Sequence, residues 1–229
     1  MYIDFHTHKQ RHKGEHDVIE VVSVHPEKHH TDGYFTIGLH PWWTNAVPDT
    51  LEMEHIRSLL FSDPACLAVG ECGLDNLKGP ALNLQESIFR SQVLLANSMN
   101  VPVIVHCVRA FDRLLGIRKE IGKTDWVVHG FMRNKILAAH LIDHGIYLSM
   151  APFEKMTESF RETMAFCPSD RFFLETDSDP LKNIRSVYNI CAEIRHTDTE
   201  TLQLQLLNNF KHFFRWKDLF LHGWNAQNC

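Results

Sequence analysis

A His-x-His pair follows the first apolar run of the chain, in the opening sequence MYIDFHTHKQ. Side chains alternate between the two faces of a β-strand, so a strand that reaches this point directs His6 and His8 to the same side. Two imidazoles aimed at one point suit a metal ion. The alternative is that both histidines are solvated in a polar loop, and the rest of the sequence decides between these two interpretations.

Five later apolar runs also end in side chains that can bind a metal or a substrate. They are His40 in GLHPWW, Glu71 and Asp75 in VGECGLD, His106 and Arg109 in VIVHCVRA, His129 in VVHGF, and Glu175, Asp177 and Asp179 in FLETDSD. A buried imidazole or carboxylate is costly unless it is paired, so its recurrence at strand ends predicts a shared site. Nitrogen and oxygen donors of this kind indicate a metal centre, and their number favours two ions over one tetrahedral ion.

Short runs rich in β-branched and aromatic residues recur along the chain, with helical patterns between most of them. We expect strands at residues 1–5, 18–24, 34–38, 66–70, 101–106, 125–129, 146–150 and 171–176. We expect helices at residues 50–61, 84–99, 110–121, 134–144, 155–166, 183–195 and 199–222. The strands are almost continuously apolar, which is typical of a parallel sheet covered by helices.

Eight strands alternating with helices predict a (β/α)8 barrel of the TIM type, in which catalytic groups come from the carboxyl ends of the strands. Residues 9–17 and 25–33 are too short and polar for good helices. We therefore expect a distorted barrel whose outer helices are reduced after the first and second strands. No linker or repeat divides the sequence, so we expect one domain over residues 1–229.

The composition excludes several classes of protein. With 229 residues, 44% hydrophobic residues and a net charge of −5, the chain has an ordinary globular composition and no basic excess for duplex DNA. Its six cysteines include no Cys-x-x-Cys pair, and no apolar run has the length of a membrane span. We expect a cytoplasmic protein with free thiols, no membrane partner and no obligate protein partner.

The ordered set of strand-end motifs resembles the TatD family of metal-dependent hydrolases, within the amidohydrolase-like barrels. The motifs are HTH (6–8), GLHPW (38–42), GECGLD (70–75), VHCVRA (105–110), VVHGF (127–131) and ETDSD (175–179). They cover roughly residues 1–180, and LLNNFKHFF (206–214) is similar to the closing helix of the family. The chain departs from the family pattern in its short segment after His-x-His and in the segment after Asp177.

The resemblance implies a distorted barrel with two divalent ions (Zn, Mn, Mg, Ni, Co or Fe) and the activity of a deoxyribonuclease. His6, His8 and Asp177 would bind one ion, His106 and His129 the other, and Glu71 both. His40 and Arg109 would hold the phosphate of a phosphodiester substrate such as a single-stranded DNA end. A hydroxide shared by the ions would attack phosphorus, with Glu71 and Asp177 as catalytic residues and Asp177 accepting the proton.

Other residues and other functions remain as alternatives. Asp75 and Glu175 are expected to support ligands, and Trp42 and Trp43 either stack a base or pack beneath a loop. The same barrel could hydrolyse a small phosphoester, amide or lactone, or could be a metal-binding relic without turnover. A histidinol-phosphatase-like barrel also begins with His-x-His, but that chemistry tends to use three metals and more ligands than this chain supplies.

Overall fold

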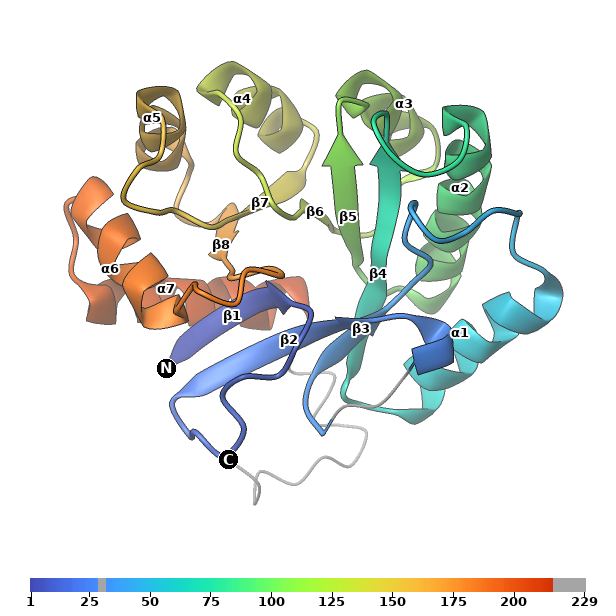
Figure 1. The fold of residues 1–229 in the computed structure, drawn as a ribbon, viewed down its shortest axis with the longest axis horizontal. Coiled ribbons are helices and arrows are strands. Elements are labelled where there is room, and N and C mark those ends of the chain that lie inside the picture. The colour runs from blue at the N-terminus through green and yellow to red at the C-terminus, as the bar shows by residue number, and fades with distance from the viewer. Residues whose placement is uncertain (29–31, 216–229) are drawn as a thin grey trace. The chain divides into compact units, whose positions relative to one another are not determined.

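The computed structural model describes residues 1–28 and 32–215, and within them strands and helices alternate from β3 to α6 (Figure 1). The strands are β1 (Tyr2–Thr7), β2 (Val18–Val24), β3 (Phe35–Ile37), β4 (Cys66–Asp75), β5 (Val103–Val108), β6 (Trp126–Val128), β7 (Ile146–Met150) and β8 (Phe172–Leu174). The helices are η1 (Pro26–Lys28), α1 (Thr50–Ser62), α2 (Leu82–Met99), α3 (Phe111–Ile121), α4 (Lys135–Asp143), α5 (Glu158–Phe166), α6 (Ile184–Ile194) and α7 (Thr199–Phe213). The sheet has eight strands in the order β1 to β8, which is the strand order of a (β/α)8 barrel.

The chain folds into two compact units. The central unit is Val22–His129, and the terminal unit combines Met1–Val21 with Gly130–Cys229. Each unit contains parallel strand pairs, among them β4 with β5 in the central unit and β7 with β8 in the terminal unit. Each unit carries functional side chains of its own.

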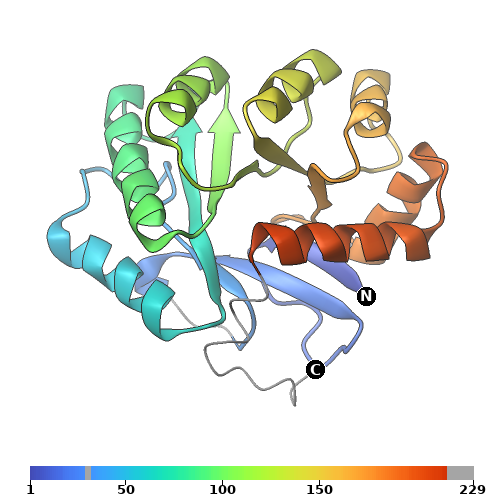
Figure 2. The same cartoon turned by 180° about the vertical axis from the view of Figure 1, so that it is seen from behind.

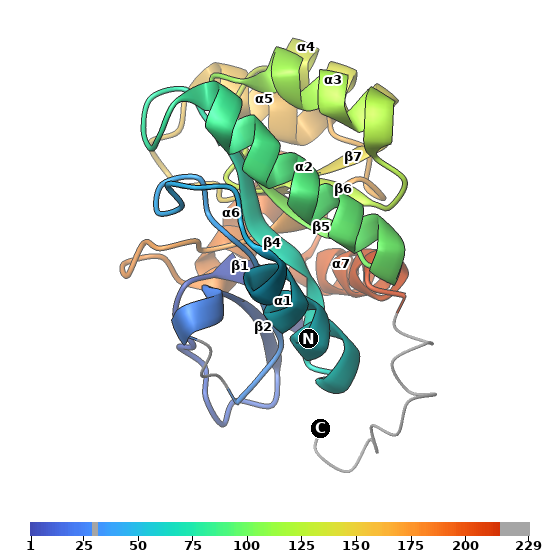
Figure 3. The ribbon, with the colours of Figure 1, turned by 90° about the vertical axis from the view of Figure 1, so that its right-hand side faces the viewer.

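The central unit is built around β4, whose ten residues are all buried. Helix α2 lies along β4 (Figure 3). Ile88 and Leu95 of α2 join a core cluster with Ile37 and Leu39, because apolar residues at helical spacing share one face of α2. This packing places the carboxyl ends of β3, β4 and β5, and the polar residues that follow them, in a fixed frame.

In the terminal unit, α7 packs against β1 and β8 (Figure 2). Phe5 of β1 stacks on Phe173 of β8, with ring centroids 3.9 Å apart, and Phe213 of α7 meets the same two rings edge-on. These rings are fully buried, and aromatic pairs of this kind add to the stabilisation from area burial. The aromatic cluster thereby joins β1 to β8 and α7, which are far apart in the sequence.

The expected elements are present, with differences at their ends. Strands β2 and β7 have the predicted bounds, while β4 continues five residues beyond the expected 66–70 and includes Glu71 and Asp75. Residues 9–17 contain no helix, and the described part of 25–33 contains only η1, so the reduction of the outer helices is confirmed. The helix expected at 199–222 ends at Phe213, and residues 216–222 lie outside the described range.

None of the helices in the described ranges combines the length and the apolar character that a membrane crossing requires.

Candidate metal centre

Three residues of the terminal unit, His6, His8 and Asp177, form what we call the terminal cluster. His6 and His8 lie at the carboxyl end of β1, and Asp177 follows β8. One potential ligand atom from each lies within 4.8 Å of the other two. The Nε2 atom of His8 is 3.4 Å from Oδ1 of Asp177. Two imidazoles and a carboxylate therefore converge here.

The backbone of Asp177 is held by β1. Its N–H donates to the carbonyl of His6 at 2.9 Å, and its carbonyl accepts the hydroxyl of Thr7 at 3.2 Å. Asp177 has a φ of +54°, in the left-handed region that side-chain-bearing residues rarely adopt. Such a conformation persists only where its surroundings fix it, so the contacts with β1 set the direction of the Asp177 side chain.

In the central unit, Glu71, His40, His106 and His129 form what we call the central cluster. Three imidazole nitrogens face one carboxylate oxygen, Oε1 of Glu71: His129 Nε2 at 2.7 Å, His106 Nδ1 at 2.9 Å and His40 Nε2 at 3.0 Å. Glu71 itself is only 3% exposed. One carboxylate oxygen offers about two lone-pair directions, which is fewer than the nitrogens around it. Several buried imidazole nitrogens beside one carboxylate are a set of ligand atoms that suits a divalent cation.

The hydrogen bonds of His40 fix its tautomer. Its Nδ1 accepts the backbone N–H of Trp42 at 3.1 Å. Because Nδ1 is the acceptor, the proton of the neutral ring lies on Nε2 and is donated to Glu71. His40 therefore orients Glu71 in this structure, and its predicted contact with phosphate stays a prediction.

His106 lies between two carboxylates. Its Nδ1 faces Glu71, and its Nε2 is 3.0 Å from Oδ2 of Asp75, which also accepts the indole N–H of Trp42 at 2.6 Å. The ring hydrogen-bonds both carboxylates when both of its nitrogens carry a proton, whereas a neutral His106 that donates to Asp75 would have its Nδ1 lone pair available for a metal ion. Ligating histidines commonly have this arrangement, with the second nitrogen held by a carboxylate.

The electrostatics of the central cluster favour an ionised carboxylate. Burial alone would raise the pKa of Glu71, but the positive charge on His129 and hydrogen bonds from all three imidazoles outweigh it and hold that pKa well below its usual range. Burial lowers the pKa of His40, and its hydrogen bond to Glu71 offsets this only in part. A neutral His40 beside an anionic Glu71 agrees with the tautomer given by the hydrogen bonds.

Two buried glutamines of α2 hold the backbone next to the cluster. Gln92 accepts the N–H of Leu39 at 2.7 Å and donates to its carbonyl at 3.1 Å. Gln85 pairs in the same way with Asp75, at 2.7 and 2.9 Å. Neither glutamine was identified from the sequence; the available signal was a glutamine repeated seven residues apart, on one face of the helix.

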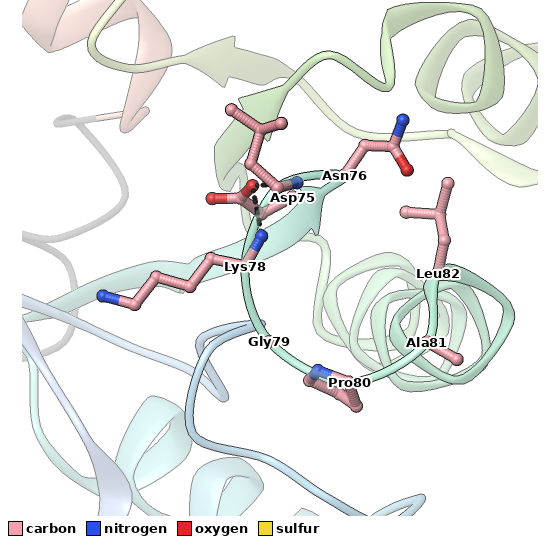
Figure 4. Close-up of a pocket in the computed structure, with 8 residues that line it drawn as sticks. Asp75, Asn76, Lys78, Gly79, Pro80, Ala81 and Leu82 are labelled. Atoms are coloured by element: carbon pink, nitrogen blue, oxygen red, sulfur yellow. Dashed lines mark hydrogen bonds between the residues drawn. The ribbon is translucent and has the colours of Figure 1, made fainter.

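A polar pocket of about 250 Å³ lies within the loop from Asp75 to Leu82, between β4 and α2 (Figure 4). Oδ1 of Asp75 accepts the N–H groups of Leu77 and Lys78, and these bonds form the turn. The side chain of Lys78 extends away from the loop, with Nζ 3.6 Å from the centre of the Trp42 ring. Asp75 thus contacts His106, in line with its expected supporting role, and also forms the turn after β4.

The remaining predicted residues lie in different settings. Arg109 is exposed directly after β5, with a φ of +50°. Trp43 is 57% exposed, and its ring centroid is 4.6 Å from that of His40. Glu175 is fully buried, and its Oε1 accepts the N–H of Gly130 at 2.7 Å. This hydrogen bond supports the backbone at Gly130.

Comparison with known proteins agrees with this description. A family model described as TatD related DNase matches residues 6–215. A relative named as the metal-dependent hydrolase YcfH, from Escherichia coli (strain K12), is 29% identical over 197 residues, covering 79% of this chain and 73% of the relative. The 3'-5' ssDNA/RNA exonuclease TatD of Klebsiella pneumoniae (strain 342) is 30% identical over 160 residues, covering 66% of this chain and 59% of that protein.

Solved structures share the fold. The crystal structure of YJJV, a TatD homologue from Escherichia coli K12, superimposes with a TM-score of 0.76 at 23% identity, covering 93% of this chain and 98% of that chain. A TatD family hydrolase from Entamoeba histolytica gives a TM-score of 0.74 at 16% identity, with coverage of 93% and 97%. Both similarities confirm the barrel fold predicted from the alternating strands and helices.

The fold and the histidine–carboxylate clusters define a metal-dependent hydrolase on a (β/α)8 barrel. Within that class, the chain belongs to the TatD family. The protein is therefore a hydrolytic enzyme, and the resemblance given by its strand-end motifs is confirmed.

Proposed function

We propose that the protein is a divalent-metal-dependent phosphodiesterase that shortens single-stranded DNA from an end. The observation that carries this proposal is the convergence of three imidazoles on Oε1 of the buried Glu71. The exonuclease name of a relative at 30% identity supports the choice of a nucleic acid substrate.

Two ions are proposed, because each unit supplies its own set of ligands. His6, His8 and Asp177 of the terminal unit would hold one ion, and Glu71, His106 and His129 of the central unit would hold the other. Imidazole-rich sets favour Zn, Mn, Fe, Co or Ni, with Mg the least natural. When bound, such ions polarise a phosphoryl oxygen and lower the pKa of water to about 7–9.

The chain's own residues supply proton transfer and orientation. Asp177 would accept the proton of the attacking water, because its carboxylate lies among the ligands and is partly open to solvent. Arg109 and His40 would orient the phosphate, and the guanidinium of Arg109 can do so with two parallel hydrogen bonds. The exposed indole of Trp43 is the better candidate for stacking on a base, since Lys78 lies over the ring of Trp42.

A second candidate is hydrolysis of a small phosphoester, amide or lactone at the same centre. The observation that favours it is the segment between β1 and β2, which has no helix. A short segment leaves less protein to contact an extended strand of DNA. The two candidates differ in substrate and share the metal chemistry.

The decisive experiment follows the length of end-labelled single-stranded DNA. Chelator-stripped protein receives Mg, Mn or Zn one at a time, and metal content is measured in parallel. We expect metal-dependent stepwise shortening. Absence of cleavage by protein that has rebound its metal would reject DNA as the substrate and lead to a screen of small phosphoesters, amides and lactones.

Asp177→Asn tests the proposed proton acceptor. We expect at least a 100-fold loss of turnover, the usual scale for a general base, with the fold retained. Asp170→Asn is the matched control, because Asp170 is an exposed carboxylate of the same unit, and it should keep full activity. Turnover near the wild-type rate in Asp177→Asn would refute the role of Asp177.

We also propose a cytoplasmic location. It is supported by the five cysteines in the described ranges, which are all buried free thiols.

A further inference from the structure

Arg11, in the short segment between β1 and β2, reaches the loop that carries Asp177. Its Nη1 donates to the carbonyl of Asp179 at 2.7 Å, and its Nη2 donates to the carbonyl of Asp177 at 3.2 Å. Longer contacts from Nη1 reach the carbonyl of Lys182 at 3.4 Å and the hydroxyl of Thr176 at 3.5 Å. One guanidinium therefore contacts four residues between 176 and 182.

The backbone of Arg11 is itself anchored. Glu20 of β2 is only 8% exposed, and both of its carboxylate oxygens accept the N–H of Arg11, at 2.9 and 3.1 Å. Oε2 of Glu20 also accepts the N–H of His12 at 2.9 Å. The buried carboxylate of Glu20 thus fixes the backbone of Arg11, and the guanidinium of Arg11 is bound by the loop after β8.

The geometry suits arginine specifically. A planar guanidinium has five N–H donors in a fixed fork, whereas a lysine ammonium is a compact charge that cannot span several carbonyls. Hydrogen bonds from a charged donor are about twice as strong as neutral ones. The contact at the Asp177 carbonyl is on the residue whose φ of +54° needs support from its surroundings.

We propose that Arg11 is a positioning residue for the metal ligand Asp177, holding the loop after β8 so that the carboxylate faces His6 and His8. The inference rests on the proposed function only in taking Asp177 as a ligand. This proposal gives a function to the segment between β1 and β2, which is too short for an outer helix. Through Arg11, the segment stabilises the loop that carries Asp177.

The test measures metal affinity without substrate. Chelator-stripped full-length protein is titrated with Mn²⁺ by calorimetry, and folding is checked by circular dichroism. Residues that orient metal ligands commonly change affinity by about 10- to 100-fold, so we expect Arg11→Ala to weaken binding at least 10-fold. Arg11→Lys should recover part of this loss, because it keeps the charge and one donor.

Arg185→Ala is the matched control. Arg185 of α6 binds the same segment through Glu15 and Asp17, at 2.6 and 2.9 Å. It has no hydrogen bond to residues 176–182 in the described part of the chain. We expect its removal to leave metal affinity unchanged; an equal loss would overturn the proposal, since the effect would then come from the segment as a whole.

A double-mutant comparison locates the effect. In an Asp177→Ala background, Arg11→Ala should weaken Mn²⁺ binding no further, because the carboxylate that Arg11 positions is already absent. Equal Mn²⁺ affinity in wild type and Arg11→Ala would overturn the proposal, as would an undiminished loss in the Asp177→Ala background. If Arg11→Ala does not fold, Arg11→Lys carries the same comparison. Failure to cleave DNA would leave this binding result intact, so the two proposals fail separately.

Discussion

Asp75 uses both carboxylate oxygens, one for the turn after β4 and one for the indole of Trp42 and the imidazole of His106. Burial would raise the pKa of Asp75, but hydrogen bonds from His106, Trp42 and Leu77 outweigh it and lower that pKa. Asp75 therefore stays an anion that orients His106, one of the proposed metal ligands.

Trp42→Phe tests whether Asp75 orients His106, because it removes one hydrogen bond to Asp75. The substitution removes the indole N–H that donates to Asp75 and keeps an aromatic ring, so His106 is held less firmly. We expect metal affinity, measured by competition with a coloured chelator, to fall about 10-fold. Trp43→Phe is the matched neighbour with an exposed indole and should keep full affinity. Unchanged affinity in Trp42→Phe would show that the indole bond does not support the site.

At the residue scale, the candidate ligands were predictable and their supports were not. The period of a strand is enough to place His6 and His8 on one side, and Asp177 follows the apolar run of another strand. The partners Gln85, Gln92 and Arg11 contact backbone from other elements. Such contacts depend on where a helix or a short segment docks, which no local pattern encodes.

Among the elements, β4 carries the most unusual backbone. Gly73 has a φ of +146°, and a Cβ atom there would lie 2.0 Å from the carbonyl oxygen of His106 on β5. Only a residue without a side chain lets β4 approach β5 this closely at the ligand. The two glycines of GECG also explain why the strand was expected to end at 70, since glycine in a strand pattern usually signals an interruption.

Gly73→Ala should therefore destabilise the protein and weaken metal binding. Overpacking of this kind costs about 3 kcal/mol, measurable as a lower urea midpoint. Gly116→Ala in α3 is the opposing control, because a Cβ there meets nothing within 4 Å. We expect it to raise the free energy of unfolding by about 0.5–1 kcal/mol, the usual gain from replacing a helical glycine. Equal midpoints for the two variants would contradict this account.

The whole molecule should be stabilised by the metal, because a ligand that binds only the folded state adds to its stability. At 100 times the dissociation constant this adds about 2.7 kcal/mol, or about 5–10 °C in melting temperature for a chain of this size. We expect Mn²⁺ to raise the melting temperature of chelator-stripped protein. Glu71→Gln should lose most of this increase. A melting temperature unaffected by saturating Mn²⁺ would argue against a metal held by the folded protein.

At this scale the sequence was most informative. Alternating apolar strands and helices suffice to identify the barrel, because a parallel sheet needs a crossover between neighbouring strands. The two compact units could not be predicted, since they depend on which strands gather around which part of the core. The predicted end of β4 at residue 70 was wrong, because the glycines of GECG resemble an interruption of the strand.

The packing of Phe5 against Phe173 and Phe213 has a consequence for biosynthesis. A ribosome releases the first strand long before the residues that cover it, so the nascent chain must keep Phe5 without its native partners while more than half of the protein is made. Joining such distant segments also requires closure of a long loop, which slows folding. Chains terminated before Phe173 would display an uncovered apolar strand, the kind of surface that chaperones bind and proteases remove.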